Sequence, residues 1–189
     1  MKLKKGTFIT VVGLFFATAL LGEPPMGGTI FMDPDIIVEE DPTLFARAEF
    51  LGEGERLVFD RRVNAWVTLE MFLFDLVFLT GQAVEARVNK EFGSVDAAQE
   101  RAEHYARFIG RIPLELMKDV ASITIHDGVM PFGGGNRNLL IHDGQGALYE
   151  ANGILEEVFV HEAAHTSLDS RHANQAAWMA AQEADPEFI

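Results

Sequence analysis

The 189-residue chain lacks cysteine altogether. It can form no disulfide and offers no thiolate ligand, so any bound metal ion must be held by histidine and carboxylate side chains. Basic residues are also few, since 15 Lys and Arg stand against 29 Asp and Glu, and the net charge is −14. Because this charge repels phosphate backbones, we expect no nucleic-acid partner, and we expect neutral or basic partners instead.

A long hydrophobic run is missing too. The most apolar stretch, residues 8–21, is shorter than the roughly 20 residues of a transmembrane helix. It follows three lysines among the first five residues, which is typical of a cleaved secretory signal peptide, with an uncleaved anchor as the alternative. We therefore expect residues 1–22 to be removed, leaving a secreted or extracytoplasmic chain with no stable membrane span. Losing three Lys and no acid changes the net charge from −14 to −17.

Residues 23–43 are rich in Pro, Gly, Asp and Glu. This composition predicts a flexible acidic leader. The alternative is that the short apolar segment 36–38 within it forms an edge strand. The remaining residues, 44–189, are enough for one domain with a sizeable core.

The first strongly periodic part of this domain predicts strands. Apolar residues 66–78 and alternating residues 84–88 flank Thr80-Gly81-Gln82, which indicates a β-hairpin. A buried helix over 67–79 is the alternative, because a short apolar run fits both structures. The glycine turn and the alternation after it favour strands.

The next segment predicts helices. Ser94 is a suitable N-cap for a helix over 95–109, whose small and apolar residues recur with helical spacing. Gly110 ends this helix. Pro113 predicts the start of a short helix that reaches Met117.

Two further predicted strands, 121–126 and 139–142, run into the same four residues, Ile-His-Asp-Gly. We expect the two strands to be neighbours. Each Asp-Gly pair predicts a turn, and His126 and His142 are expected to hydrogen-bond locally, with direct metal binding as the alternative. The glycines at 133–135 predict a flexible loop over a cleft, because no Lys-Ser/Thr or helix start follows them as in a phosphate-binding loop.

The most informative pattern is His161-Glu162-Ala163-Ala164-His165. Two histidines four residues apart share one face of a helix and can bind one metal ion. Glu162 then lies beside the ion and can take a proton from a water molecule. The alternative is an amphipathic surface helix with two incidental histidines.

The segment before the motif supports a helix, since residues 153–160 contain no proline. Ile154 and Val158 align with the two histidines of the motif in one stripe. We therefore expect this stripe to face the interior, and Glu156 and Glu157 to face water.

A catalytic metal ion needs a third protein ligand, and the sequence offers three candidates. Asp169 continues the row of the two histidines but stands about 6 Å beyond the second one on a straight helix, so we favour a supporting hydrogen bond or a cap over direct binding. His172 lies one residue past the last ligand position of the metzincin pattern, whose glycine is replaced here by Leu168, so a metzincin is disfavoured. Glu183, on a predicted helix over 173–184, is the remaining candidate, with a solvated helix residue as the alternative.

The motif and its continuation to Asp169, preceded by Phe132-Gly133-Gly134-Gly135-Asn136 and Asn138-Leu139-Leu140-Ile141-His142, resemble secreted bacterial HExxH proteins of the zincin superfamily. The resemblance runs from about Phe59 to the C-terminus. It implies an α+β, zincin-like fold, in which a small antiparallel or mixed sheet packs on the HExxH helix with additional helices. It also implies that the edge strand binds an extended peptide, and that Zn²⁺ held by the two histidines activates water, with Glu162 as the general base.

The resemblance favours a secreted zinc-dependent endopeptidase, a hydrolase acting on peptides or proteins. Tyr149 and His142 are candidate donors to the oxyanion of the reaction. In gluzincin-like members a Glu on a later helix is the third ligand, and such proteins continue past the position of Ile189. The alternative is therefore an inactive secreted metal-binding or surface interaction protein on a C-terminally truncated zincin scaffold.

Overall fold

The computed structural model describes residues 42–167, 176, 180 and 183–184. The predicted signal peptide, the predicted leader up to residue 41 and two candidate ligands, Asp169 and His172, lie outside these residues. No helix within the described part is long and apolar enough to cross a membrane.

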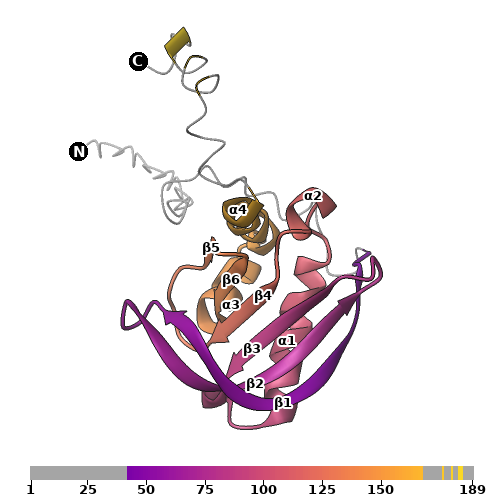
Figure 1. The fold of residues 1–189 in the computed structure, drawn as a ribbon, viewed down its shortest axis with the longest axis vertical. Coiled ribbons are helices and arrows are strands. Elements are labelled where there is room, and N and C mark those ends of the chain that lie inside the picture. The colour runs from indigo at the N-terminus through magenta and orange to yellow at the C-terminus, as the bar shows by residue number, and fades with distance from the viewer. Residues whose placement is uncertain (1–41, 168–175, 177–179, 181–182, 185–189) are drawn as a thin grey trace, which may run out of the picture.

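A six-stranded sheet organises the fold. Its strands are β1 Phe45–Asp60, β2 Ala65–Phe78, β3 Ala83–Asn89, β4 Ser122–His126, β5 Gly133–Gly135 and β6 Asn138–His142. They lie in the order β1-β2-β3-β4-β6-β5 (Figure 1). β1, β2 and β3 are antiparallel, β3, β4 and β6 are parallel, and β5 returns antiparallel to β6 at the edge. The sheet is therefore mixed, and the predicted α+β class is correct.

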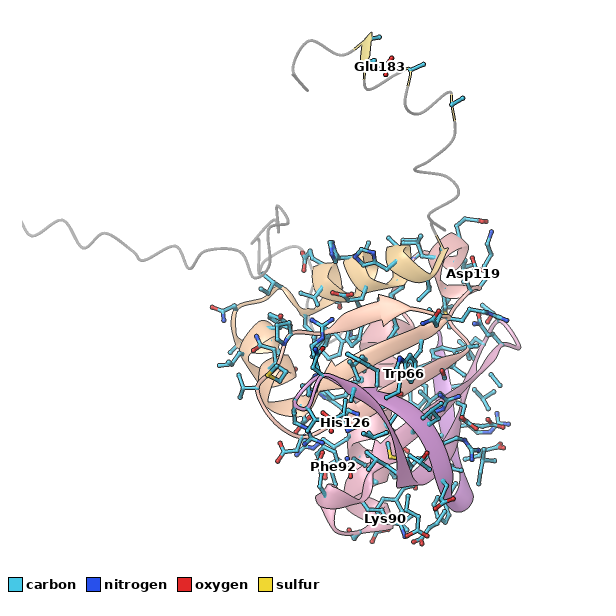
Figure 2. The ribbon with its side chains drawn as sticks, turned by 60° about the vertical axis from the view of Figure 1, so that its left-hand side comes forward. Trp66, Lys90, Phe92, Asp119, His126 and Glu183 are labelled. Carbon is cyan, nitrogen blue, oxygen red and sulfur yellow. The ribbon has the colours of Figure 1, made fainter. Side chains whose placement is uncertain are left out.

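The predicted hairpin is confirmed, because β2 and β3 pair on either side of the Thr80-Gly81-Gln82 turn. Gly81 adopts a φ of 84° there, and the helix alternative over 67–79 is wrong. The sequence did not predict β1, which pairs with β2 along its length and bulges near Gly52, where φ is 121°. The long β1–β2 hairpin curls, and Trp66 near its tip lies over the other strands of the sheet (Figure 2).

The predicted helix over 95–109 is confirmed as α1, Val95–Ile109. The Ser94 hydroxyl accepts a hydrogen bond from the Ala97 backbone N–H, and Gly110 ends the helix. The short helix α2, Leu114–Met117, follows Pro113 as predicted. A 3-10 turn, η2 Lys90–Phe92, joins β3 to this part of the chain.

The last two helices are α3, Asp143–Ala151, and α4, Leu155–Ser167. The turn predicted at Asp143-Gly144 is wrong, since this pair begins α3. At Asp127-Gly128 the turn prediction is correct, and the Asp127 carboxylate accepts a hydrogen bond of 2.7 Å from the Gly128 N–H. A residue after a strand end can therefore cap a turn or enter a helix, and the short Asp-Gly pattern does not separate the two.

The hydrophobic core lies between the sheet and the helices α1 and α4. Alternate residues of β4 point to opposite faces, so Ile123 and Ile125 join the core, whereas Ser122 and Thr124 point to the other face. The curled β1–β2 hairpin partly covers that second face, which explains why every residue of β4 is buried.

Candidate metal centre

The motif predicted from sequence lies on α4, within its last two turns. His161 and His165 are both exposed, and their Nε2 atoms are 3.2 Å apart. Their rings meet edge to face with centroids 4.9 Å apart. The two nitrogens therefore converge on one point at the surface of the helix.

The separation of these nitrogens fits a zinc ion. Two Zn–N bonds of about 2.0–2.1 Å at a tetrahedral angle place their nitrogens about 3.3–3.4 Å apart. The observed 3.2 Å between His161 Nε2 and His165 Nε2 is close to this distance. Imidazole nitrogens are also ligands that zinc accepts readily, so the pair suits the ion in both geometry and chemistry.

The orientation of α4 differs from the predicted one. Ile154 and Val158 are buried as expected, but the two histidines that follow them in the stripe are exposed. At 100° per residue, the inward face is centred near Phe159 and Ala163, both fully buried, and the two histidines lie about 140° to 180° away, on the opposite side of the helix. The four residues do stay within about 60° of one another on the helix, but this stripe is not the face centred on Phe159, and only its first two members, near the start of α4, are covered.

The prediction that Glu156 faces water is also wrong. Its side chain is 9% exposed, and its Oε1 accepts a hydrogen bond of 2.5 Å from the Arg111 guanidinium. This ion pair joins the first turn of α4 to the segment that follows α1. Glu157, the next residue, is half-buried, which is closer to the prediction that both glutamates face water.

Glu162 lies between the buried face of α4 and the two histidines, and it is half-buried. The edge strand β5 passes directly over its backbone, since a Cβ placed on Gly134 would come 1.8 Å from the Glu162 carbonyl oxygen. Only glycine permits this approach. The predicted base and the sheet edge are thus held side by side, and β5 lies next to α4 (Figure 1).

The flexible loop predicted at 133–135 is therefore wrong, because these glycines form β5. Asn136 and Arg137 connect β5 to β6 in a two-residue turn, with φ values of 51° and 60°. Two positive φ angles are typical of the tight hairpin turn that suits twisted strands. Glycines predicted a loop because they have low strand propensity, whereas in β5 the close contact of Gly134 with α4 requires a glycine at that position.

The two candidate oxyanion donors lie in different places. Tyr149, on α3, is buried, and both its burial and the nearby Glu162 carboxylate raise the pKa of its hydroxyl. The phenol is therefore protonated at neutral pH, close to the predicted base. His142 instead ends β6 and packs against His126, with ring centroids 5.6 Å apart.

No third ligand completes the histidine pair among the residues that the structure describes, because no three His, Asp or Glu side chains there are grouped to hold a metal ion. Glu183 is described and exposed, and it joins no such group. Asp169 and His172 lie outside the described residues. The described part of the chain thus supplies two candidate nitrogen ligands and a neighbouring carboxylate.

The prediction that the strands ending at His126 and His142 are neighbours is confirmed. β4 and β6 are parallel, and the two histidines are paired in register. Both are fully buried, and burial lowers the pKa of each, that of His142 to about 4. These histidines are therefore neutral at physiological pH.

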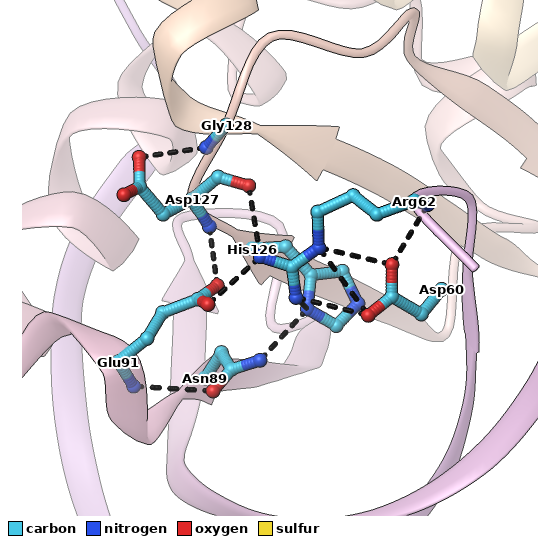
Figure 3. Close-up of polar contacts among 7 residues, drawn as sticks. All are labelled: Asp60, Arg62, Asn89, Glu91, His126, Asp127 and Gly128. Carbon is cyan, nitrogen blue, oxygen red and sulfur yellow. Dashed lines mark hydrogen bonds and ion pairs between the residues drawn. The ribbon is translucent and has the colours of Figure 1, made fainter.

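Around His126 lies a polar network that the sequence did not reveal (Figure 3). Arg62 binds Asp60 at 2.9 Å and Glu91 at 2.8 Å, and Asn89 Nδ2 lies 3.0 Å from His126 Nδ1. Bonding from Arg62 lowers the pKa of the Asp60 carboxyl to about 2. The network ties the tip of the β1–β2 hairpin to the ends of β3 and β4.

No protein-family model matches the sequence, and no curated protein or solved structure matches the chain. The zincin resemblance stays a prediction, based on the residues around β5, β6 and the α4 motif.

Proposed function

We propose that this protein is a secreted zinc-dependent endopeptidase whose metal is held by His161 and His165. The observation that supports the proposal best is the convergence of their Nε2 atoms to 3.2 Å on the exposed side of α4, next to Glu162. The 3.2 Å separation also allows a hydrogen bond between the two rings, and the half-buried carboxylate and the sheet edge beside the pair are what favour a metal centre.

The residues of the centre have separate roles in this proposal. A zinc ion bound by the two imidazoles would supply Lewis-acid chemistry to a water molecule and to a peptide carbonyl. The Glu162 carboxylate accepts the proton of the attacking water and passes it to the leaving amine. The protonated hydroxyl of Tyr149, near Glu162, is a hydrogen-bond donor available to the developing oxyanion.

The sheet edge supports a peptide as the substrate. Among the described strands β5 pairs only with β6, so its second edge is open. An extended peptide can add to such an edge through backbone hydrogen bonds. Because Gly134 touches the Glu162 backbone, a peptide bound along β5 passes close to the predicted base.

Peptide hydrolysis by the full zinc-loaded chain tests the proposal, with an unstructured protein such as casein as substrate. Glu162→Gln should lower the rate by about 10²- to 10⁴-fold, the usual contribution of a general base, while the protein still binds zinc. Glu157→Gln is the matched control, since it removes the same charge from the same helix and should keep the rate. A rate unaffected by Glu162→Gln would contradict the mechanism, and bound zinc without any hydrolysis would favour the non-catalytic metal-binding alternative.

A further inference from the structure

A pocket of about 350 Å³ lies on the face of the sheet opposite the core. It is enclosed by the tip of the β1–β2 hairpin, including Trp66, and by the strands β4, β5 and β6 (Figure 2). Ser122, Thr124 and Asn138 form its polar floor, where the two hydroxyls donate to the Asn138 amide oxygen at 2.9 and 3.0 Å. The pocket is therefore built from ordered strand residues.

The charge of this pocket is opposite to that of the protein. Three arginines line it, Arg61, Arg87 and Arg137, and no Asp or Glu does. The whole chain, by contrast, carries a net charge of −14. The local charge of the pocket is therefore positive and favours an acidic ligand at this place.

Two of the three guanidinium groups have no carboxylate partner within the described residues. Arg87 binds Glu85 at 2.5 Å, but Arg137 bonds only to the Asp119 carbonyl oxygen, at 3.2 Å. Arg61 is half-buried and forms no ion pair with any carboxylate in the described part of the chain. A guanidinium binds a carboxylate through two parallel N–H···O bonds, so these groups can accept one from a ligand.

Strand β5 separates this pocket from the histidine pair. A Cβ placed on Gly133 would lie 2.8 Å from an Arg61 guanidinium nitrogen, whereas one on Gly134 would meet the Glu162 backbone. One face of β5 thus contacts Arg61, and the other contacts α4. A peptide added to the open edge of β5 presents its side chains alternately to these same two faces.

We propose that the arginine-lined pocket binds an acidic side chain of an extended peptide, Asp or Glu, next to the bond that is cut. This inference rests on the proposed peptidase function and defines its substrate class. One carboxylate suits the pocket better than a nucleic acid, because the net charge of −14 on the whole chain repels a polyanion.

Binding of blocked peptides tests the inference apart from catalysis. The probes are acetylated, amidated hexapeptides of alanine with one central Glu or one central Gln, titrated by calorimetry into the full zinc-loaded chain carrying Glu162→Gln. The Glu peptide should bind about tenfold tighter than the Gln peptide. Arg61→Gln should remove this preference, and Arg47→Gln should keep it, since Arg47 lies on the same hairpin but pairs with Glu49 outside the pocket.

Equal binding of the two peptides, or equal effects of the two arginine substitutions, would overturn the inference. Tighter binding of an acetylated alanine peptide whose only carboxylate is its C-terminus would overturn the side-chain assignment. Trp66 fluorescence gives a second readout, because Trp178→Phe leaves it as the only tryptophan, and the Glu peptide should change its emission. Charge-selective binding with no cleavage by the unsubstituted chain would refute the peptidase proposal alone, whereas cleavage with no charge preference would refute this inference alone.

Discussion

His161 and His165 stand on the exposed side of α4 with their Nε2 atoms 3.2 Å apart. His126 and His142 end two parallel strands, fully buried, with ring centroids 5.6 Å apart. One helical turn aims two imidazoles at a single point, whereas strand register lays them side by side. The same residue type thus forms a converging pair in one place and a stacked pair in the other.

The surroundings make the two pairs chemically different as well. An Arg62 guanidinium nitrogen lies 3.4 Å from His126 Nδ1, so the buried pair is next to a fixed positive charge. That charge opposes a metal cation, and burial opposes protonation. The strand pair is therefore suited to a neutral structural role, and the α4 pair to binding an ion.

The largest expected difference between the pairs concerns zinc affinity. His165→Asn should lower it by more than about 100-fold, because even changes to hydrogen-bond partners of zinc ligands cost 10- to 100-fold. His126→Asn should leave it unchanged. Competition with a chromophoric chelator measures both affinities, and equal losses in the two variants would remove the distinction between the pairs.

The buried pair should instead make stability depend on pH. The pKa of His142 is about 4 in the folded chain and about 6.5 in the unfolded chain. The unfolded chain therefore binds more protons between these values, and the free energy of unfolding should fall as the pH drops from about 6.5 to about 4, by at most about 3 kcal/mol from this residue. His126, whose pKa is also lowered, adds an effect of the same sign.

Urea unfolding at a series of pH values checks this dependence. His142→Gln should reduce the slope between pH 6.5 and 4, whatever it does to stability at pH 7. A slope that is the same with and without His142 would show that the buried ring does not carry the effect.

The next largest effect is expected from Gly134→Ala. It should lower the free energy of unfolding by about 2 kcal/mol, because the new Cβ meets the helix backbone at Glu162. Gly133→Ala is the matched control, since its Cβ meets the end of the flexible Arg61 side chain. Thermal unfolding of the two variants compares them. Equal stability of the two would argue against the close contact of β5 with α4.

Asn89→Ala should have the smallest effect, lowering the free energy of unfolding by about 1 kcal/mol, because it removes the nearer of the two polar neighbours of the buried His126 Nδ1. Zinc affinity should not change, because the network of Figure 3 lies around the strand pair. A loss of zinc from this variant would link the two histidine pairs and contradict their independence.

Several helices, turns and motifs that are marked by residues within the element itself were predicted correctly from the sequence. Ser94 and Gly110 marked the ends of α1, Gly81 marked the β2–β3 turn, and the HExxH spacing brought the two histidines together. Each of these features is decided within a few residues of the chain.

The features that were missed depend on contacts between distant segments. β1 carries many exposed charged residues and a bulge at Gly52, so its pattern is hidden until it pairs with β2. Arg62 reaches Glu91 and the Asp127 carbonyl, 29 and 65 residues away. The arginine-lined pocket likewise needs the hairpin to curl over β4 and β6, which no local pattern indicates.

The zinc content of the purified full chain tests the central claim most directly. Elemental analysis should find about one zinc per chain, and it should find none when His161→Asn and His165→Asn are combined. Zinc that is absent from the unsubstituted chain after zinc loading, or that is retained by the double variant, would contradict a metal centre on α4.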